Sequence, residues 1–516
     1  MNKLKYTFFL LLAMMGCSDR LDLRDPNNAT TGTFWQTESQ ALAGCDAIYN
    51  SLIIDGTYMR MTPALSDARG DDMRGDSPWV DYVQVSNFSI PTTSAPVQWV
   101  WGAWYQLIWR ANQVLEKVPA IDMDADLQKR IIGQAHFLRG LAYFNLANLY
   151  KVVPLITQTP KGSEDSYPAT ATEEQIWAQI IADFQEAKDL LPISYANVSG
   201  ADMGQIGRAT KGAATGMLGK AYLYRKQWQN AADQFNLLIN GPELNIYSLV
   251  SNYRDNFTAS NENNSESLFE VQFAGPNEVG GSVPNWGGDP TSSWKQVSGQ
   301  ACTYGADGYG WSDFLPTTWI YNEYKQEKTK DGKTDPRLLA TIASYEPDDN
   351  STTVYGNPWP YATNKIYPRK YTNDGLGVAN EYDLNSGINY RVLRYADILL
   401  MYAEALNELG QTAAAYPYIQ QVRDRANLPD LVASKPNLAQ TQMRDQIAHE
   451  RALEFASEGQ RINDIIRWGW LYDADKLTML KTHDPDFNTW TAGNEYLPIP
   501  QTELDVNKNL LPNPAN

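Results

Sequence analysis

The feature that most constrains the fold is a recurring pair of short helices with small residues at fixed positions. The clearest pair lies in residues 209–240. Its marker residues are Leu218, Gly219, Tyr222, Ala231 and Phe235, with a turn at Gln227 and Trp228. The small residues let two antiparallel helices approach closely, and the aromatic rings fill the space between them. A chain built from such pairs folds as a mostly α-helical protein.

This spacing is that of the tetratricopeptide repeat. It recurs at Ala403, Leu406, Ala415, Ile419 and Val422. A third copy fits Gly140 and Tyr143 with Ile180, Phe184 and Ala187, and a fourth pairs residues 38–53 with 99–118. Because long insertions separate the copies, we expect a tetratricopeptide-like helical frame and not one continuous solenoid.

A loop-rich, aromatic-rich block interrupts the helical pattern. Between residues 241 and 390 the helical periodicity fades, and only residues 267–273 alternate as a strand does. Disorder would leave many tryptophan and tyrosine rings exposed, so we expect a folded, variable face on the helical frame. We therefore predict a single domain over residues 17–516, with the frame in 34–240 and 391–470 and the loop-rich insert in 241–390.

A charge-rich motif lies near the C-terminus. Its residues are Glu450, Glu454 and Glu458, followed by Gly459, Arg461, Asp464 and Arg467. The glutamates share one side of a helix, and the glycine is a natural helix stop. The charged residues after the glycine can form ion pairs with the glutamates. We predict a lattice of ion pairs that fixes two helices. Catalytic carboxylates are disfavoured because the two acids of a glycosidase face each other across the substrate.

The N-terminus has the pattern of an export signal. Lys3 and Lys5 precede an apolar run over residues 6–15 that ends at Gly16 and Cys17. The run is shorter than the roughly 20 residues that cross a bilayer as a helix, and its charged start is typical of a secretory signal. We predict a signal peptide over residues 1–16 and lipid attachment at Cys17. An ordinary signal with an unmodified cysteine is the alternative.

Several stretches together resemble the SusD/RagB family, surface lipoproteins that capture nutrients for TonB-dependent transporters. They are residues 394–405, the Glu-x-x-x-Glu-Gly-x-Arg core at 454–461, residues 496–500 and residues 509–514. With the N-terminus, the match runs from end to end. The resemblance implies a SusD-like helical frame, a location on the outer membrane at the cell surface, and a SusC-like transporter as partner. It also implies a ligand face made by a loop after the first helix and by loops of the variable half.

Candidate ligand-binding residues come from two stretches that combine aromatic rings with planar polar groups, as carbohydrate recognition requires. Residues 55–96 read as a long loop and supply Asp67, Asp72, Arg74 and Trp79. The insert supplies Trp286, Trp294, Cys302, Tyr304 and Trp311, with Arg369 as their polar partner. A calcium-binding acidic loop is the alternative for the first stretch. A core position is the alternative for any single tryptophan of the second.

Composition excludes several classes of function. The formal net charge is −18 and no basic cluster exists, which disfavours nucleic acid and anionic lipid as partners. The three histidines are widely separated, which disfavours a histidine metal site or a catalytic triad. Cys45 and Cys302 remain beside Cys17, and the sequence leaves open whether they pair.

These observations favour a binding protein without catalytic residues or cofactor. We expect it to capture a nutrient, above all an oligosaccharide or polysaccharide, and to deliver it to a TonB-dependent transporter in polysaccharide utilisation. Three alternatives stay open: a secreted glycoside hydrolase, a peptide-binding member of the resembled family, and a tetratricopeptide adaptor.

Overall fold

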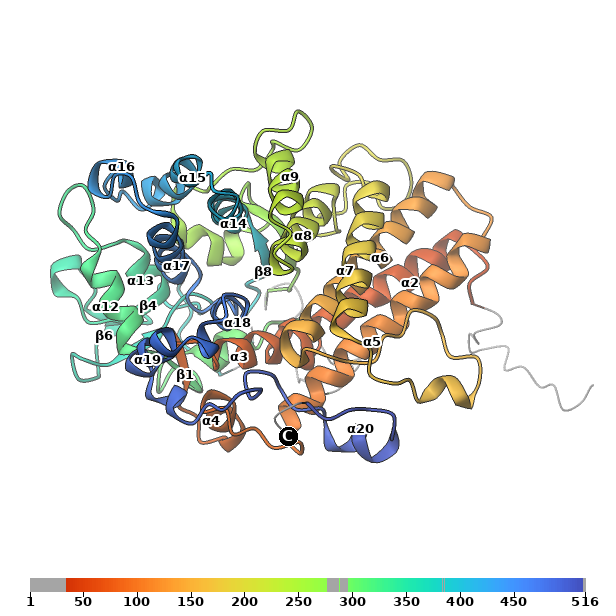
Figure 1. Cartoon of the computed structure of the whole chain (residues 1–516), viewed down its shortest axis with the longest axis horizontal. Coiled ribbons are helices and arrows are strands. Elements are labelled where there is room, and N and C mark those ends of the chain that lie inside the picture. Colours follow the sequence, from red (N-terminus) through yellow and green to blue (C-terminus); the bar gives the residue numbers. More distant parts are fainter. Residues whose placement is uncertain (1–33, 276–286, 288–295, 383, 385, 514–516) are drawn as a thin grey trace, which may run out of the picture.

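The computed structural model describes residues 34–275, 287, 296–382, 384 and 386–513 (Figure 1). The predicted signal peptide, Cys17, Trp286 and Trp294 lie outside these residues. The helices are α2 (Glu38–Asn50), α3 (Met61–Asp67), α4 (Val80–Ser86), α5 (Ala95–Lys117), α6 (Ala125–Tyr150), α7 (Glu173–Leu190), α8 (Lys211–Tyr224), α9 (Trp228–Ile239), α11 (Gln300–Tyr304), α12 (Thr318–Gln326), α13 (Arg337–Thr341), α14 (Tyr395–Glu408), α15 (Thr412–Arg425), α16 (Leu431–Ser434), α17 (Gln440–Phe455), α18 (Arg461–Arg467), α19 (Ala474–His483) and α20 (Gln501–Val506). None of these described helices has the length and hydrophobicity that a bilayer crossing requires.

The predicted helix pairs form, and local sequence explains why. At the start of α2, the Thr37 hydroxyl accepts a hydrogen bond from the backbone N–H of Gln40, whose side chain accepts from the Thr37 N–H. In the pair α8–α9, a Cβ added to Gly219 would lie 2.6 Å from a ring carbon of Phe235. The glycine of the repeat pattern is therefore needed for the close approach of the two helices.

The pairs stack continuously, which corrects the expectation of an interrupted frame. Besides the pairs α6–α7, α8–α9 and α14–α15, α7 packs on α8 and α9 packs on α14. Figure 1 shows the run of helices from α2 and α5 on the right to α15 and α17 on the left. The insert leaves the stack after α9 and returns before α14, so these two helices remain neighbours.

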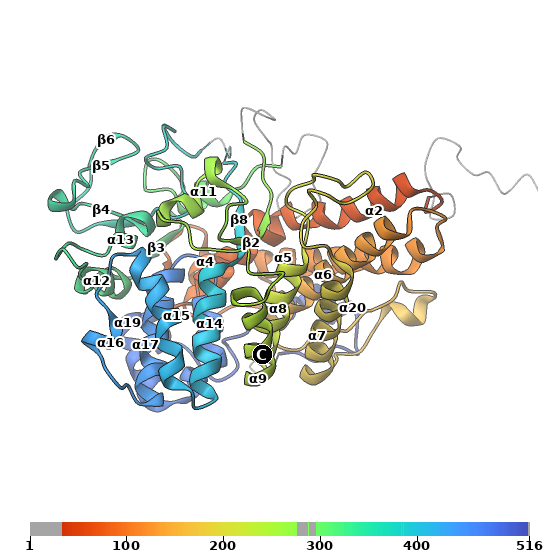
Figure 2. The ribbon, with the colours of Figure 1, turned by 90° about the horizontal axis from the view of Figure 1, so that it is seen from above.

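Short strands organise the insert. The strands are β1 (Met73–Gly75), β2 (Ser267–Val271), β3 (Phe314–Pro316), β4 (Ile342–Ser344), β5 (Thr353–Val354), β6 (Asn357–Pro358), β7 (Ile366–Pro368) and β8 (Tyr390–Arg394). They form four antiparallel pairs, β1–β3, β2–β8, β4–β7 and β5–β6. Figure 2 shows α11, β4 and β5 on one side of the molecule and α14, α15 and α17 on the other. The predicted fold class, a helical frame with a loop-rich region, is confirmed.

Residues 55–96 are not the predicted long loop. A short π-helix (Asp55–Met59), α3, β1 and α4 occupy most of this segment. All seven residues of α3 are buried. A helix buried on every side has no polar face, so it lacks the periodicity by which a sequence reveals a helix.

The C-terminal motif forms a buried ion-pair lattice, but with other partners than predicted. Its helix α17 ends at Phe455, so Glu458 lies beyond the helix. The pairs are Glu450 with Arg337 and Arg423, Glu454 with Arg337, Arg394 and Arg425, and Glu458 with Lys370 and Arg394. Arg461 instead pairs with Asp71, and Asp464 with Arg451 and Arg467. The lattice therefore joins α17 to α15, to β8 and to the insert.

The two cysteines outside the N-terminal segment do not pair. Cys45 on α2 and Cys302 on α11 are both free thiols, and both are buried. Burial raises the pKa of each thiol to about 12. A buried thiol with so high a pKa behaves as a small apolar core residue and not as a nucleophile.

Candidate binding site

A cavity of about 560 Å³ gathers aromatic side chains from four separate segments. Its aromatic residues are Trp79, Trp99, Trp311 and Tyr382, and its charged residues are Arg60, Asp307 and Asp313. Trp79 precedes α4, Trp99 lies on α5, and Trp311 lies between α11 and β3. The cavity is thus built where the helical frame meets the insert.

Arg60 holds the two walls of this cavity together. Its guanidinium carbon lies 5.8 Å from the ring centroid of Trp79 and 5.6 Å from that of Trp311, within the range of cation–π attraction. The guanidinium also donates two hydrogen bonds to Asp55, from Nε to Oδ1 and from Nη2 to Oδ2, each 2.9 Å long. This bidentate pair sets the plane of the guanidinium and with it the positions of both indoles.

The remaining side chains add a second aromatic contact and hydrogen-bonding groups. The ring centroids of Trp79 and Trp99 lie 5.7 Å apart, and the Tyr382 ring is 47 % exposed. The Ser77 hydroxyl donates to Asp313 at 2.5 Å, and burial raises the pKa of Asp313 above its usual value. Partly exposed indoles next to a carboxylate can stack on the apolar face of a ring and bond its hydroxyl groups.

Of the predicted site residues, Trp79 and Trp311 come together in this cavity. Cys302 and Tyr304 lie on α11 in the core, 1 % and 2 % exposed, and do not line the cavity. Arg74 lies on β1 opposite Leu315 and does not line the cavity. Trp286 and Trp294 cannot be placed, because they lie outside the described residues.

Asp67 and Asp72, also predicted to bind ligand, lie in the core and do not line this cavity. Asp67 accepts hydrogen bonds from the Gly459 backbone N–H at 2.6 Å and from the Tyr304 hydroxyl at 2.7 Å. Asp72 accepts from the Ser457 N–H at 3.2 Å. Their exposed fractions are 2 % and 0 %, so neither can reach a ligand at the surface. They hold the turn that follows α17.

The ionisation of these two carboxyl groups reflects the same burial. Burial raises the pKa of Asp67 to about 6, and burial with the neighbouring Asp67 and Asp71 raises that of Asp72 to about 8. Asp71 behaves oppositely, because Arg461 and His483 outweigh burial and lower its pKa to about 2. Among the described residues, no group of His, Cys, Asp and Glu is arranged to hold a metal ion.

Arg369 belongs to a different cavity from the tryptophans. It lines a space of about 340 Å³ together with Arg254, Arg337 and Arg425. Arg369 is therefore not among the residues that line the cavity with Trp311.

The sequence reading missed Arg60, Trp99 and Tyr382. One signal was available for Trp99, because the buried face of α5 follows Val97, Val100, Trp101 and Trp104. Trp99 falls between these positions and is only partly buried. A tryptophan off the core stripe of an amphipathic helix is a candidate for ligand contact. Nothing in the sequence around Arg60 marks it as the residue between two indoles.

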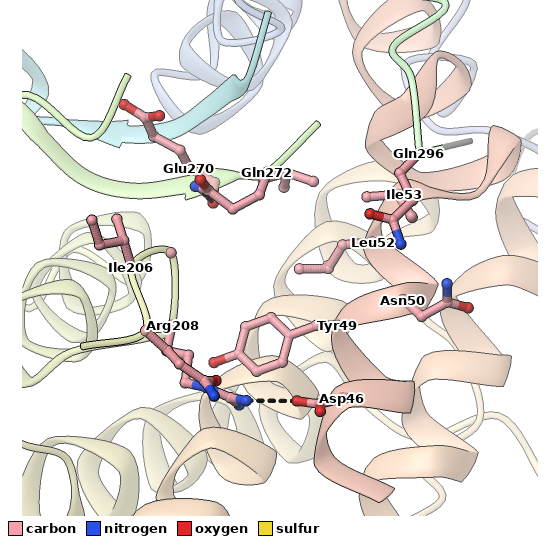
Figure 3. Close-up of a pocket in the computed structure, with 13 residues that line it drawn as sticks. Asp46, Tyr49, Asn50, Leu52, Ile53, Ile206, Arg208, Glu270, Gln272 and Gln296 are labelled. Carbon is pink, nitrogen blue, oxygen red and sulfur yellow. Dashed lines mark hydrogen bonds and ion pairs between the residues drawn. The ribbon is translucent and has the colours of Figure 1, made fainter. Parts of the chain in front are cut away.

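A second cavity, of about 250 Å³ between α2 and β2, is a weaker candidate (Figure 3). Its one aromatic ring, Tyr49, lies 5.7 Å from the Arg208 guanidinium carbon, which covers the ring face. Arg208 is itself paired with Asp46 at 2.7 Å, the contact that is dashed in Figure 3. This cavity therefore presents no open aromatic face, and the cavity around Arg60 is the stronger candidate for a binding site.

Known proteins match this chain over almost its whole length. The family model described as "SusD family" matches residues 265–515, and the one described as "Starch-binding associating with outer membrane" matches residues 36–223. SusD-like protein P2 of Formosa agariphila is 28 % identical over 535 residues, covering 99 % of both chains.

Solved structures agree. A SusD superfamily protein from Bacteroides vulgatus has a TM-score of 0.81 and 28 % identity, covering 94 % of this chain and all of its own. A structure described as a laminarin binding SusD-like protein has a TM-score of 0.75 and 29 % identity, covering 93 % and 100 %. The last of these names is that of a binding protein and none of the three is that of an enzyme, in agreement with the prediction of a non-catalytic protein. The helical frame, the C-terminal motif and these matches together establish that the chain belongs to the SusD family.

Proposed function

We propose that this chain is a surface-exposed lipoprotein of the outer membrane that captures a glycan and passes it to a SusC-like, TonB-dependent transporter. The observation that carries the proposal is the cavity in which Arg60 holds Trp79 and Trp311 beside Trp99. Sugar rings present apolar C–H faces to such indoles and hydroxyl groups to carboxylates such as Asp313.

Capture requires little rearrangement of the protein. Arg60 is 4 % exposed and doubly bonded to Asp55, so the indoles beside it are already fixed before a ligand arrives. A pre-organised site loses less side-chain entropy on binding than a mobile one. The acidic net charge does not repel a neutral glycan. The relative described as laminarin binding makes laminarin the first polysaccharide to test.

The experiment is affinity electrophoresis of the mature protein in gels that contain single polysaccharides, beginning with laminarin. One polysaccharide is expected to retard the wild type. Trp79→Ala and Trp311→Ala are each expected to weaken the retardation about tenfold or more, as removal of a central aromatic contact does. Trp109→Ala is the matched control, because Trp109 is 49 % exposed on α5 and does not line the cavity. Equal loss in all three variants would contradict the assignment of the site.

The glycoside hydrolase alternative is tested in the same samples. The cavity contains two carboxylates, Asp307 and Asp313, and a hydrolase needs two. Release of shorter sugars that stops in Asp313→Asn would make the protein an enzyme. Retardation by no polysaccharide would instead favour a peptide cargo.

A further inference from the structure

The cavity lined by Arg254, Arg337, Arg369 and Arg425 carries a positive charge that the carboxylates of the described residues do not fully balance. It is lined by residues at the start of α13, residues at the end of α15 and residues 374–376. Four arginines line it, and Asp374 is the one carboxylate among the lining residues described. The protein as a whole is strongly acidic, with a net charge of −18, so a cationic cavity is unusual in it.

Two of the four arginines form ion pairs with carboxylates that do not line the cavity. Arg337 pairs with Asp335, Glu450 and Glu454. Arg425 pairs with Glu266 and Glu454, although its Nε makes no hydrogen bond and the side chain is 3 % exposed. Arg369 pairs with Asp374, so the positive charge without a paired carboxylate among the described residues is that of Arg254.

Arg254 is held by carbonyl groups alone. Its guanidinium donates to the backbone oxygens of Arg369 and Lys370, at 2.9 and 2.7 Å, and to that of Thr372 at 2.7 Å. No carboxylate of the described residues lies within ion-pair distance of it. Burial, and after it the nearby positive charge of Arg369, lower the pKa of Arg254 to about 10.

The Arg369 guanidinium donates one hydrogen bond, from Nη1 to the backbone oxygen of Leu339 at 3.1 Å. Its Nε lies 3.1 Å from Asp374 Oδ2, yet neither atom makes a hydrogen bond. Its side chain is 22 % exposed, and a Cβ added to Gly375 would lie 2.9 Å from its Nη2. Gly375 has a φ of +80°, so a side chain is disfavoured there on two grounds. The glycine leaves space beside the guanidinium.

We propose that this cavity binds the carboxylate or sulfate group of an acidic sugar. Two guanidiniums facing one space bind an oxyanion through charge-assisted hydrogen bonds, and the anion relieves their mutual repulsion. A cavity of about 340 Å³ holds a small ligand and not a long chain segment. The proposal rests on the function proposed above, because it adds an anionic sugar to the glycans that the protein captures.

The test is calorimetric titration of the mature protein with sodium D-glucuronate, with D-glucose as the neutral counterpart. Glucuronate is expected to bind and glucose not to bind at this site. Arg369→Gln is expected to weaken glucuronate binding about tenfold or more, and Lys365→Gln, at an exposed cation that does not line the cavity, to leave it unchanged. Asp374→Asn is expected to strengthen binding, because it removes the competing carboxylate and keeps the oxygen that accepts from the Tyr355 N–H. A purely structural role for these residues would not produce that increase.

Sodium sulfate at equal ionic strength separates the sources of the anion. Binding of both sulfate and glucuronate supports the proposal, and binding of sulfate alone means an adventitious ion only and overturns it. Glucuronate binding that is unchanged in Arg369→Gln also overturns it. Trp311→Ala separates this proposal from the previous one, since it is expected to abolish neutral-glycan retardation and to leave glucuronate binding intact.

Discussion

At the scale of single residues, the proposed binding site depends on Arg60. Lysine in its place keeps the charge, but an ammonium cannot form the bidentate pair with Asp55 or lie as a plane between two indoles. We predict that Arg60→Lys weakens glycan binding about tenfold or more, measured by calorimetry with the glycan that retards the wild type. Arg74→Lys, outside the cavity, is the control. Unchanged affinity in Arg60→Lys would show that the indoles are positioned without it.

A second prediction concerns Asp72, whose pKa is about 8 in the folded protein against a usual value near 4. Between these values the folded protein holds a proton that the unfolded chain releases, so this group makes stability fall as pH rises from about 4 to about 8. Asp72→Asn retains an oxygen for the Ser457 N–H and removes this dependence. We predict that the melting temperature of the variant declines less between pH 5 and pH 8 than that of the wild type. Parallel curves for the two proteins would contradict the pKa assignment, and exposed Asp76→Asn is the control.

At this scale, Trp79 and Trp311 line the candidate cavity, whereas the acidic residues Asp67 and Asp72 are buried away from it. Trp79 and Trp311 could be selected because a tryptophan in a stretch without helical period is hard to assign to packing. Asp67 could not be judged, because an acidic residue near glycines reads as solvated. Its actual partner, the Gly459 backbone N–H, lies 392 residues away in sequence. Burial of a carboxylate is decided by such distant contacts, which one sequence does not display.

At the scale of elements, the helix pairs were predictable. The existence of an ion-pair lattice was also predictable, but its partner residues were not. The pair α8–α9 is local, and its spacing is visible in a window of about 30 residues. The partners of Glu454 come instead from α13, β8 and α15. Nothing in the motif itself indicates these distant arginines.

The lattice makes a direct prediction for stability. Glu454 is fully buried, and its three arginines outweigh the effect of burial and lower its pKa to about 2. We predict that Glu454→Gln lowers the free energy of unfolding by about 3 kcal/mol or more, because it leaves buried guanidiniums without their counter-charge. Glu408→Gln, which removes a pair with the half-exposed Arg444, is expected to cost less than about 1 kcal/mol. Chemical denaturation of both variants measures the difference, and equal losses would contradict a special role for the buried lattice.

At the scale of the whole molecule, the frame and the insert build the candidate cavity together. The continuous stack of helices supplies Trp99, and segments that pack on it supply Trp79 and Trp311. The fold class could be predicted because the stack is repetitive. The binding cavity could not be assembled from sequence, because it lies at the junction of segments that are far apart along the chain.

The sequence of the N-terminal segment predicts attachment of the protein to the outer membrane. If Cys17 carries lipid, Cys17→Ala moves the protein from the outer-membrane fraction to the soluble fraction while leaving glycan binding unchanged, since the cavity is distant in sequence from this segment. Fractionation of cells that express each form measures this. Retention of Cys17→Ala in the membrane fraction would show that the attachment is not through this cysteine.

The central claim is that the cavity around Arg60 captures a glycan without cleaving it. The most direct measurement is a calorimetric titration with an oligosaccharide of the retarding glycan, followed by chromatography of the recovered sugar. The account predicts saturable binding to one site, recovery of the sugar at its original length, and loss of the heat signal in Trp311→Ala. Recovery of shorter sugars, or an unchanged signal in Trp311→Ala, would contradict it.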